Sequence, residues 1–302
     1  MNKVGFIGVG IMGKSMVRNL MKAGFELHIY ARTKSKVEDV IGEGAQFHES
    51  IKDCVQDCDA VITIVGFPQD VEEVYFDEGN ILDSAKEGAY LIDMTTTSPQ
   101  IAEKIYEEGT KRGFHVMDAP VTGGDTGAKA GTLSILVGGE KEDYEACMPL
   151  FEAMGTNINY QGKAGCGQHC KLANQIMIAG TLSGVCEALT YAKEQGLDPE
   201  VFMKSVATGA AGSKQLDTFG PKILKDDYAP GFFMKHFIKD MKLALIEANR
   251  KGLSLDVLSM VLANYEELEQ EGYGDLGTQA LMKFYDEEHQ NTEDPAGVSS
   301  VL

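Results

Sequence analysis

The chain has 302 residues, a length at which two domains are the natural expectation. Its composition, 43% hydrophobic and 24% charged, is that of a globular protein and excludes a disordered or fibrous one. The formal net charge is −19 and no dense Lys/Arg cluster interrupts it, so nucleic acid and anionic membrane are poor partners. Any anionic ligand has to be attracted by local amides and a few cations.

The cysteines are scattered, and the N-terminal apolar run, residues 4–12, is too short and glycine-rich for a secretory or membrane segment. We therefore expect reduced thiols and a cytoplasmic protein. The six cysteines are Cys54, Cys58, Cys147, Cys166, Cys170 and Cys186.

Short β-type runs alternate with amphipathic helical stretches up to residue 163. The expected strands are 3–8, 26–30, 60–65, 89–94, 115–120, 132–138 and 157–161. This spacing is typical of βα units and predicts an α/β domain over residues 1–163, with a doubly wound, mainly parallel sheet covered by helices on both faces.

From residue 164 the pattern is helical, which predicts an all-α domain over residues 164–302. Its first helix, 168–196, is apolar on most sides, but four polar residues in it argue against a membrane span and favour a buried spine. Shorter helices are expected at 199–208, 213–225, 234–251, 255–271 and 276–286, followed by a mobile tail.

The first strand runs into a G-x-G-x-x-G pattern formed by Gly8, Gly10 and Gly13. In a strand-turn-helix context the first glycine turns the chain, the second admits a pyrophosphate and the third lets the helix pack on the strand. The helix N-terminus offers free amides to phosphate. A plain tight turn is the alternative, but the following strand favours a dinucleotide site, with predicted contacts at Gly8, Val9, Gly10, Ile11, Met12 and Gly13.

The end of the second strand indicates which dinucleotide binds. It carries Arg32 and Thr33 and no carboxylate that would bind the ribose 2′-hydroxyl of NAD. Arg32 can pair with a 2′-phosphate and Thr33 can hydrogen-bond to it, which favours NADP over NAD. The alternative is an arginine on a solvated loop.

A glycine-rich stretch, 118–139, begins at the end of the fifth expected strand. The Thr122 hydroxyl beside the bare amides of Gly123 and Gly124 can cradle a carboxylate. A β-bulge and loop would use the same glycines, and spacing alone does not decide between the two.

Lys171, Asn174 and Gln175 share one face of the long helix, so a cation and two amides can point into one cleft. A buried lysine has a lowered pKa and can exchange a proton near neutrality. A solvated surface lysine is the alternative reading.

Two further clusters do not define a site by themselves. Cys166, His169 and Cys170 have no matching Cys/His pair elsewhere, so we reject zinc and predict no metal. Lys239 and Asp240 are explained by an ordinary charge pattern on a helix surface.

Five stretches, in order over residues 3–286, resemble the β-hydroxyacid dehydrogenase family, which includes 3-hydroxyisobutyrate dehydrogenase, tartronate semialdehyde reductase and the glyoxylate/succinic semialdehyde reductases. They are GFIGVGIMG, IDMTTTSP, DAPVTGG with its following glycines, GCGQHCKLANQ and FIKDMKLAL. The resemblance implies a Rossmann-type domain, a long interdomain helix, and a helical domain that also forms a homodimer or homotetramer.

The resemblance also implies roles for single residues. Lys171 would be the catalytic lysine, assisted by the amide of Asn174 or Gln175. The substrate carboxylate would bind at Thr122, Gly123 and Gly124. The cofactor would contact Val65 on its adenosine side, and Thr96 and Lys239 near the nicotinamide. Lys214 stands where many relatives carry tryptophan, which leaves the substrate open.

The predicted reaction is reversible hydride transfer between the nicotinamide and the carbinol carbon of a short β-hydroxyacid, with Lys171 as general acid/base. The small-molecule partner is that hydroxyacid or its semialdehyde. Three alternatives share the architecture: a 6-phosphogluconate dehydrogenase-like enzyme, an imine reductase-like enzyme, and a non-catalytic NADP-binding module.

Overall fold

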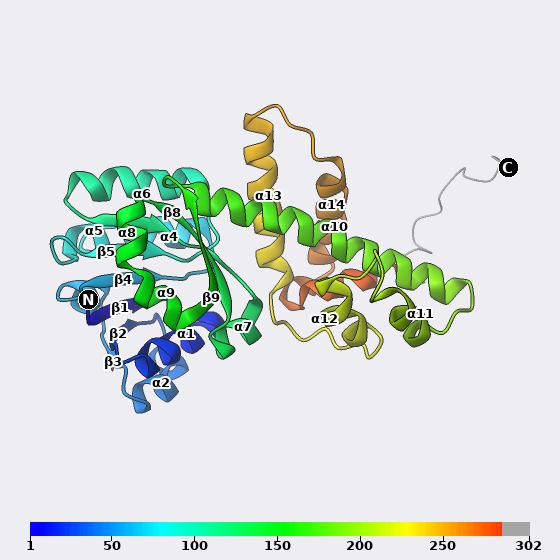
Figure 1. The fold of residues 1–302 in the computed structure, drawn as a ribbon, viewed down its shortest axis with the longest axis horizontal. Coiled ribbons are helices and arrows are strands. Elements are labelled where there is room, and N and C mark those ends of the chain that lie inside the picture. Colours follow the sequence, from blue (N-terminus) through cyan, green and yellow to red (C-terminus); the bar gives the residue numbers. More distant parts are fainter. Residues whose placement is uncertain (286–302) are drawn as a thin grey trace. The chain divides into compact units, whose positions relative to one another are not determined.

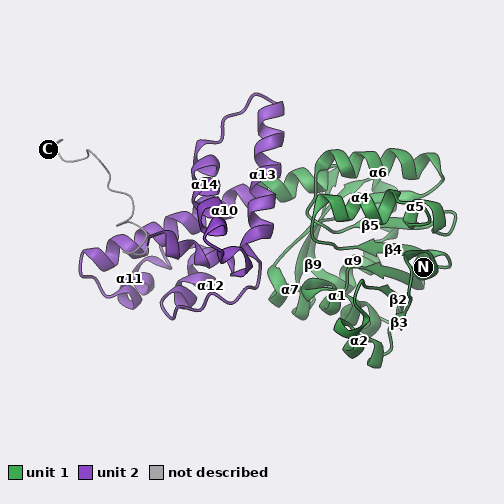
Figure 2. Cartoon of the chain, turned by 180° about the vertical axis from the view of Figure 1, so that it is seen from behind, with its two compact units in different colours: residues 1–173 green, residues 174–302 purple. Residues whose placement is uncertain are grey.

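The computed structural model describes residues 1–285 and contains two compact units, residues 1–173 and residues 174 onward (Figure 2). The division between the units falls inside helix α10 (Cys166–Glu194). The first turns of α10 count with unit 1 because Gln168 bonds to the backbone of Thr95 and Thr97.

Unit 1 contains a nine-stranded sheet within the described residues (Figure 1). Its strands are β1 (Lys3–Ile7), β2 (Glu26–Tyr30), β3 (Gln46–Phe47), β4 (Ala60–Thr63), β5 (Tyr90–Asp93), β6 (His115–Asp118), β7 (Val121–Thr122), β8 (Leu133–Gly139) and β9 (Gly155–Gly162). The two-residue strands β3 and β7 are additions to the seven strands expected from the sequence.

Helices connect these strands. They are α1 (Ile11–Lys22), α2 (Glu38–Gly42), α3 (Ile51–Val55), α4 (Pro68–Phe76), α5 (Ile81–Ser84), α6 (Pro99–Lys111), α7 (Gly124–Ala130), α8 (Lys141–Ala146) and α9 (Met148–Met154), with a 3-10 turn η1 (Lys34–Lys36) after β2.

The strand order β3-β2-β1-β4-β5-β6 is parallel throughout. It is that of a dinucleotide-binding Rossmann sheet, and the order reverses between β1 and β4, where such sheets bind ligands at the carboxyl ends of the strands. Beyond β6, β8 pairs antiparallel with β6 and β7 and parallel with β9. The expected α/β, doubly wound fold class is confirmed.

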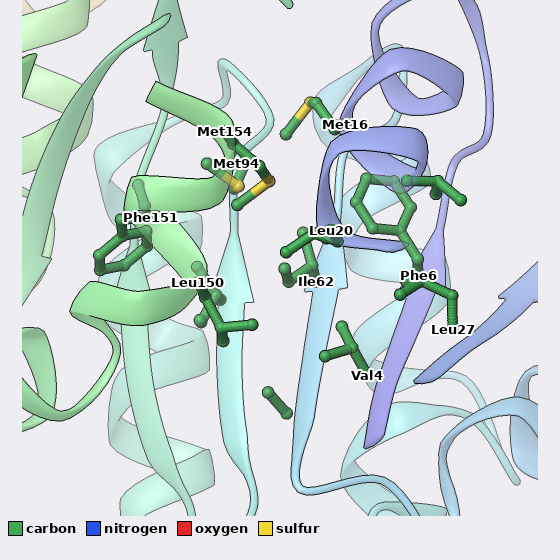
Figure 3. Packing of buried hydrophobic residues seen from close by; sticks show 14 of the residues in the cluster. Val4, Phe6, Met16, Leu20, Leu27, Ile62, Met94, Leu150, Phe151 and Met154 are labelled. Carbon is green, nitrogen blue, oxygen red and sulfur yellow. The ribbon is translucent and has the colours of Figure 1, made fainter. Parts of the chain in front are cut away.

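Alternating side chains bury both faces of this sheet. Val4 and Phe6 of β1 belong to one buried cluster, which is covered by α1 and α9 through residues such as Leu20 and Phe151 (Figure 3). Ile7 points into a second cluster, which α3, α4 and α6 cover on the opposite face. Two apolar faces therefore hold the carboxyl ends of the strands in fixed register.

Unit 2 is helical, as expected. It holds the rest of α10 with α11 (Pro199–Val206), α12 (Lys214–Ile223), α13 (Met234–Arg250), α14 (Asp256–Gln270) and the 3-10 segments η2 (Tyr273–Asp275) and η3 (Thr278–Tyr285). Phe237 of α13 packs edge-to-face on Tyr265 of α14, and the Tyr265 hydroxyl donates to the Thr278 carbonyl over 2.7 Å. The helix expected at 276–286 is therefore a 3-10 segment over its described part, and the tail lies outside the described residues.

The long helix α10 is less enclosed than its sequence suggested. Leu182, Cys186 and Leu189 are buried, but Met177 and Tyr191 are 73% and 67% exposed. By length and composition alone α10 is long and apolar enough to cross a membrane, but the core helices of soluble proteins meet the same criterion. In its most apolar stretch of 18 residues, 44% is buried inside the protein.

Candidate active site

The turn from β1 to α1 uses its three glycines in three different ways. Gly8 has φ +97°, and a Cβ there would lie 2.7 Å from the carbonyl carbon of Ile64. A Cβ at Gly13 would lie 3.1 Å from both the carbonyl carbon of Gly8 and a ring carbon of Phe6, whereas at Gly10 it would meet nothing within 4 Å. Gly8 and Gly13 are thus required by close contacts with neighbouring protein atoms, whereas the space beside Gly10 is open to a ligand.

The N-terminus of α1 lies at this open position. Gly10 is the N-cap and contributes no side-chain acceptor, the first turn carries no acidic residue, and Gly10 and Ile11 are exposed. Val9 is buried and Met12 is half-buried against the core, so these two offer backbone amides rather than side chains. Free amides and the positive end of the helix dipole suit a pyrophosphate.

Arg32 and Thr33 follow β2 and are exposed. The Arg32 guanidinium, 73% exposed, lies 3.3 Å from a carboxylate oxygen of Asp70 in α4. The other Asp70 oxygen accepts the Phe67 backbone N–H at 2.9 Å and so caps α4. Arg32 is therefore held at the end of β2 with its cationic face open to solvent.

The loops after β4 and β5 are bonded to each other. The Val65 backbone N–H donates to the Thr95 hydroxyl over 3.0 Å, and Thr95 is 1% exposed. Thr96, the predicted nicotinamide contact, is the half-buried neighbour of this threonine. The two predicted cofactor segments are thus joined by a hydrogen bond at the carboxyl ends of β4 and β5.

Asp93 supports that edge from below. Its Oδ1 accepts the Thr63 hydroxyl at 2.7 Å and the Thr95 backbone N–H at 3.1 Å, while its Oδ2 has no hydrogen-bond partner in the part of the chain that the structure describes. Burial raises the pKa of Asp93 to about 6, against the hydrogen bonds, which lower it.

Asp118 ends the next strand and lies against the start of α10. Its two oxygens accept the backbone N–H groups of Gly165 and Gln168 at 2.7 and 2.8 Å. The Gln168 side chain, fully buried, accepts the Thr97 backbone N–H at 3.0 Å and donates to the Thr95 carbonyl at 2.7 Å. The beginning of α10 is therefore fixed to the carboxyl ends of β5 and β6.

Lys171 follows on α10 and is 7% exposed, so the alternative of a solvated surface lysine is excluded. Within unit 2, Gln175 accepts the Asn174 side-chain amide at 2.8 Å and donates to the Asp240 carboxylate at 2.7 Å. Lys239 is ion-paired with the other Asp240 oxygen at 3.0 Å, and the two side chains are 11% and 1% exposed, so the expected charge pattern on a helix surface is wrong. Both amide ends of Gln175 are thus engaged in a buried network.

The glycine-rich stretch begins with a strand, a turn and a helix, and its last strand, β8, shows register shifts against β9 at Leu133/Ser134 and Val137/Gly138. Thr122 of β7 pairs with Ser134 of β8. Gly123 and Gly124 have φ +131° and +65°, and Gly123 is the exposed N-cap of α7. These two glycines lie beside the half-buried Thr122, and exposed backbone at such a turn can present its amides to an anion.

Two other features singled out in the sequence have the following surroundings. Among residues 1–285 no group of three or more His, Cys, Asp or Glu side chains could hold a metal ion, and Cys166, His169 and Cys170 form no such group. Lys214 is the exposed first residue of α12, whose N-cap Ser213 accepts the Leu216 backbone N–H at 3.1 Å.

The sequence patterns above do not single out Asp93, Asp118 or Gln168. A signal for the two aspartates exists, since each ends a short apolar strand at the sheet edge where dinucleotide sites form. Gln168 has no comparable signal, because its partners are backbone groups 71 and 73 residues away.

The sheet order, the glycine turn and the open helix N-terminus define the class: a Rossmann-type dinucleotide-binding protein. Comparison with known proteins agrees. Residues 3–162 match the family described as the NAD binding domain of 6-phosphogluconate dehydrogenase. Residues 165–285 match the one described as NAD-binding of NADP-dependent 3-hydroxyisobutyrate dehydrogenase.

Individual relatives cover nearly the whole chain. An uncharacterized oxidoreductase of Bacillus subtilis is 50% identical over 93% of this chain and 98% of its own length. A 2-hydroxy-3-oxopropionate reductase of Escherichia coli is 37% identical over 84% and 86%. Among solved structures, that of a 3-hydroxyisobutyrate dehydrogenase from Mycobacterium tuberculosis with L-serine superposes with a TM-score of 0.86 at 26% identity. The alignment covers 94% of this chain and 98% of that chain.

The chain belongs to the β-hydroxyacid dehydrogenase family, a family of NAD(P)-dependent oxidoreductases that act on small hydroxyacids. Its cofactor is a nicotinamide dinucleotide, and the residues of the β1–α1 turn fit the diphosphate of such a group.

Proposed function

We propose that this protein interconverts a short β-hydroxyacid and its semialdehyde by hydride transfer to or from NADP. The observation that carries the proposal is the burial of Lys171 on a helix whose start is bonded to the carboxyl edge of a dinucleotide-binding sheet. When bound, the nicotinamide supplies the hydride chemistry, and the protein supplies placement and the proton.

In the reducing direction the Lys171 ammonium donates a proton to the oxygen that becomes the alcohol, while the carbonyl carbon receives the hydride. In the oxidising direction the neutral amine takes the hydroxyl proton as the hydride leaves the carbinol carbon. The amides and hydroxyl at Thr122, Gly123 and Gly124 hold the substrate carboxylate, which fixes the carbon to be attacked.

Of the two candidate amides, we assign the assisting role to Asn174. Gln175 is 1% exposed. Its side-chain oxygen already accepts from Asn174, and its side-chain nitrogen already donates to Asp240. Asn174 is half-buried and shares the Lys171 face of α10. Lys239 stays a prediction as a cofactor residue.

NADP is the proposed form of the cofactor. Three cations, Arg32, Lys34 and Lys36, lie within the six residues after β2, and all three are exposed although the chain has a net charge of −19. A 2′-phosphate would meet this cationic segment at the end of β2, where no carboxylate follows the strand to accept a free 2′-hydroxyl.

The proposed assembly is a homodimer or homotetramer in the cytoplasm. Large apolar side chains are exposed on three helices of unit 2, at Met177, Tyr191, Val201, Val257 and Met260. A second copy would cover them. All six thiols are free, in keeping with a reducing compartment. Light scattering coupled to size exclusion measures the assembly, and a monomer would contradict it.

The testing experiment follows NADPH oxidation with 2-hydroxy-3-oxopropionate, glyoxylate, succinic semialdehyde and methylmalonate semialdehyde, and NADP reduction with 3-hydroxyisobutyrate and L-serine. We expect turnover of at least one pair and a loss of about 100- to 10,000-fold in kcat for Lys171→Ala. Lys171→Arg should be similarly inactive, because a guanidinium does not release its proton. Lys163→Ala, at an exposed lysine shortly before α10, is the matched control. Tight NADPH binding without turnover of any compound would identify a non-catalytic module.

A further inference from the structure

The start of α10 is capped by a side chain from another strand. The residue before the helix is Gly165, with φ +86°, and it has no side chain to accept the free N–H groups of the first turn. Asp118 takes this place from β6, accepting the N–H groups of Gly165 and Gln168. This is the work that an Asp or Ser N-cap does within a helix, carried out by a residue 47 positions away.

Two glycines allow the carboxylate to lie between β8 and α10. A Cβ at Gly138 would lie 2.6 Å from Oδ1 of Asp118 and 2.8 Å from the backbone nitrogen of Gly167. A Cβ at Gly167 would lie 2.8 Å from Oδ2 of the same carboxylate. A residue with a side chain at either position would not permit so close an approach of the Asp118 carboxylate to α10 and β8. This packing fixes the residue at which α10 begins.

The Gln168 side chain then joins the helix to the loop after β5. Its amide accepts from the N–H of Thr97 and donates to the carbonyl of Thr95, so it binds the backbone on both sides of Thr96. Lys171 lies three residues further along the helix, about 4.5 Å along its axis. One side chain therefore connects the predicted nicotinamide contact with the predicted proton donor.

We propose that Asp118 and Gln168 are positioning residues that set the place of Lys171 relative to Thr96 and thereby the alignment of proton and hydride transfer. The proposal rests on the function proposed above. Neither side chain touches the reacting atoms. A displacement of about 1 Å at a reacting group can cost about 100-fold in rate, so such a frame has a kinetic effect beyond its contribution to stability.

The first test compares Gln168→Leu, Gln168→Glu and a control, Asp143→Leu. Asp143 lies on α8 and is buried, and its carboxylate is 2.7 Å from Nδ1 of His115, the first residue of β6. Its replacement therefore also removes a buried hydrogen-bonding side chain from unit 1, but at the end of β6 away from Asp118. We expect kcat to fall about 100-fold for Gln168→Leu, and less for Gln168→Glu, which keeps the acceptor for the Thr97 N–H. The KM for NADPH should change less than threefold.

A structural role alone would not produce the second readout. With deuterium at C4 of NADPH, the isotope effect on kcat should rise in Gln168→Leu and stay at the wild-type value in Asp143→Leu, because misalignment slows the chemical step. If Gln168→Leu lost only as much activity as Asp143→Leu and its isotope effect did not change, the proposal would be overturned.

Amide hydrogen exchange separates this proposal from the proposed function. In the protein without substrate, Gln168→Leu should speed exchange at Thr97 by at least tenfold and leave the β2 amides unchanged. Faster exchange in an enzyme that turns over none of the substrate panel would refute the proposed function and leave the frame intact. Unchanged exchange at Thr97 would refute the frame whatever the activity.

Discussion

Asp93 and Asp118 lie opposite each other in the β5–β6 register, at the carboxyl ends of their strands, and both are buried. Asp118 receives two backbone N–H groups from the start of α10. Asp93 receives the Thr63 hydroxyl and the Thr95 N–H on one oxygen only. Burial raises the pKa of both groups, that of Asp93 to about 6. The edge that faces the cofactor site is thus built on two acids that differ in how well their charge is stabilised.

Asp93 should make the free energy of unfolding fall as the pH rises from about 4 to about 6. Its pKa is about 6 in the folded chain against about 3.9 unfolded, so between these values the folded state binds more protons. The stabilisation that Asp93 provides is fully present below about pH 4 and is lost above about pH 6. The free energy of unfolding should fall by up to about 3 kcal/mol between these pH values. Asp93→Asn keeps the acceptor and removes the charge.

Urea unfolding at pH 4.5 and 7.5 measures this effect as the difference between Asp93→Asn and the wild type. Relative to the wild type, the free energy of unfolding of Asp93→Asn should be higher at pH 7.5 than at pH 4.5. Surface carboxylates such as Asp59, whose pKa is lowered by a hydrogen bond from Lys86, act in the opposite direction, but they cancel in this difference. A difference that is independent of pH would contradict the prediction.

Gly10→Ala and Gly13→Ala should fail in different ways. A Cβ at Gly10 meets no protein atom, so we expect a cost of at most about 1 kcal/mol in stability, with NADPH affinity lowered at least tenfold because the methyl group occupies the phosphate's approach. A Cβ at Gly13 meets Gly8 and Phe6, so overpacking should cost about 1–3 kcal/mol. Thermal unfolding and fluorescence titration measure both, and equal effects on stability would contradict the distinction.

Arg32→Ala should weaken NADPH much more than NADH. Loss of a charge-assisted hydrogen bond to the 2′-phosphate, about 1.5–3 kcal/mol, corresponds to roughly 10- to 100-fold in the KM for NADPH. Arg112→Ala is a suitable control, because Arg112 is also an exposed arginine in an ion pair, with Asp83, but precedes the amino end of β6. Equal losses with both cofactors would show that Arg32 does not select NADP.

Asn174→Leu and Gln175→Leu should separate catalysis from folding. Removing Gln175 leaves the buried Asp240 carboxylate short of a donor, so we expect a loss of about 1–3 kcal/mol in stability. Removing Asn174 should lower kcat about 100-fold with a smaller change in stability. Steady-state kinetics and urea unfolding test the pair, and the reverse pattern would assign the assisting amide to Gln175.

The sequence determined those features that short-range periodicity and backbone requirements impose. Alternating apolar runs and amphipathic helices indicated the doubly wound sheet and the helical second part, because the period of burial is local. The turn at Gly8, Gly10 and Gly13 was predictable for the same reason, since each glycine meets a steric demand from the adjoining strand and helix. The 3-10 form of η3 was not predictable, because its apolar pattern suits either helix.

Only the tertiary structure decided which polar groups are buried and what they bind. Lys171 could have been a surface cation by sequence, and the fold places it at 7% exposure. Gln175 looked equivalent to Asn174 until its bond to Asp240, 65 residues away, occupied it. The same holds for Asp118 at the start of α10. Hydrogen bonds between distant segments leave no periodic trace in the chain, because their partners meet only after the sheet and helices have packed.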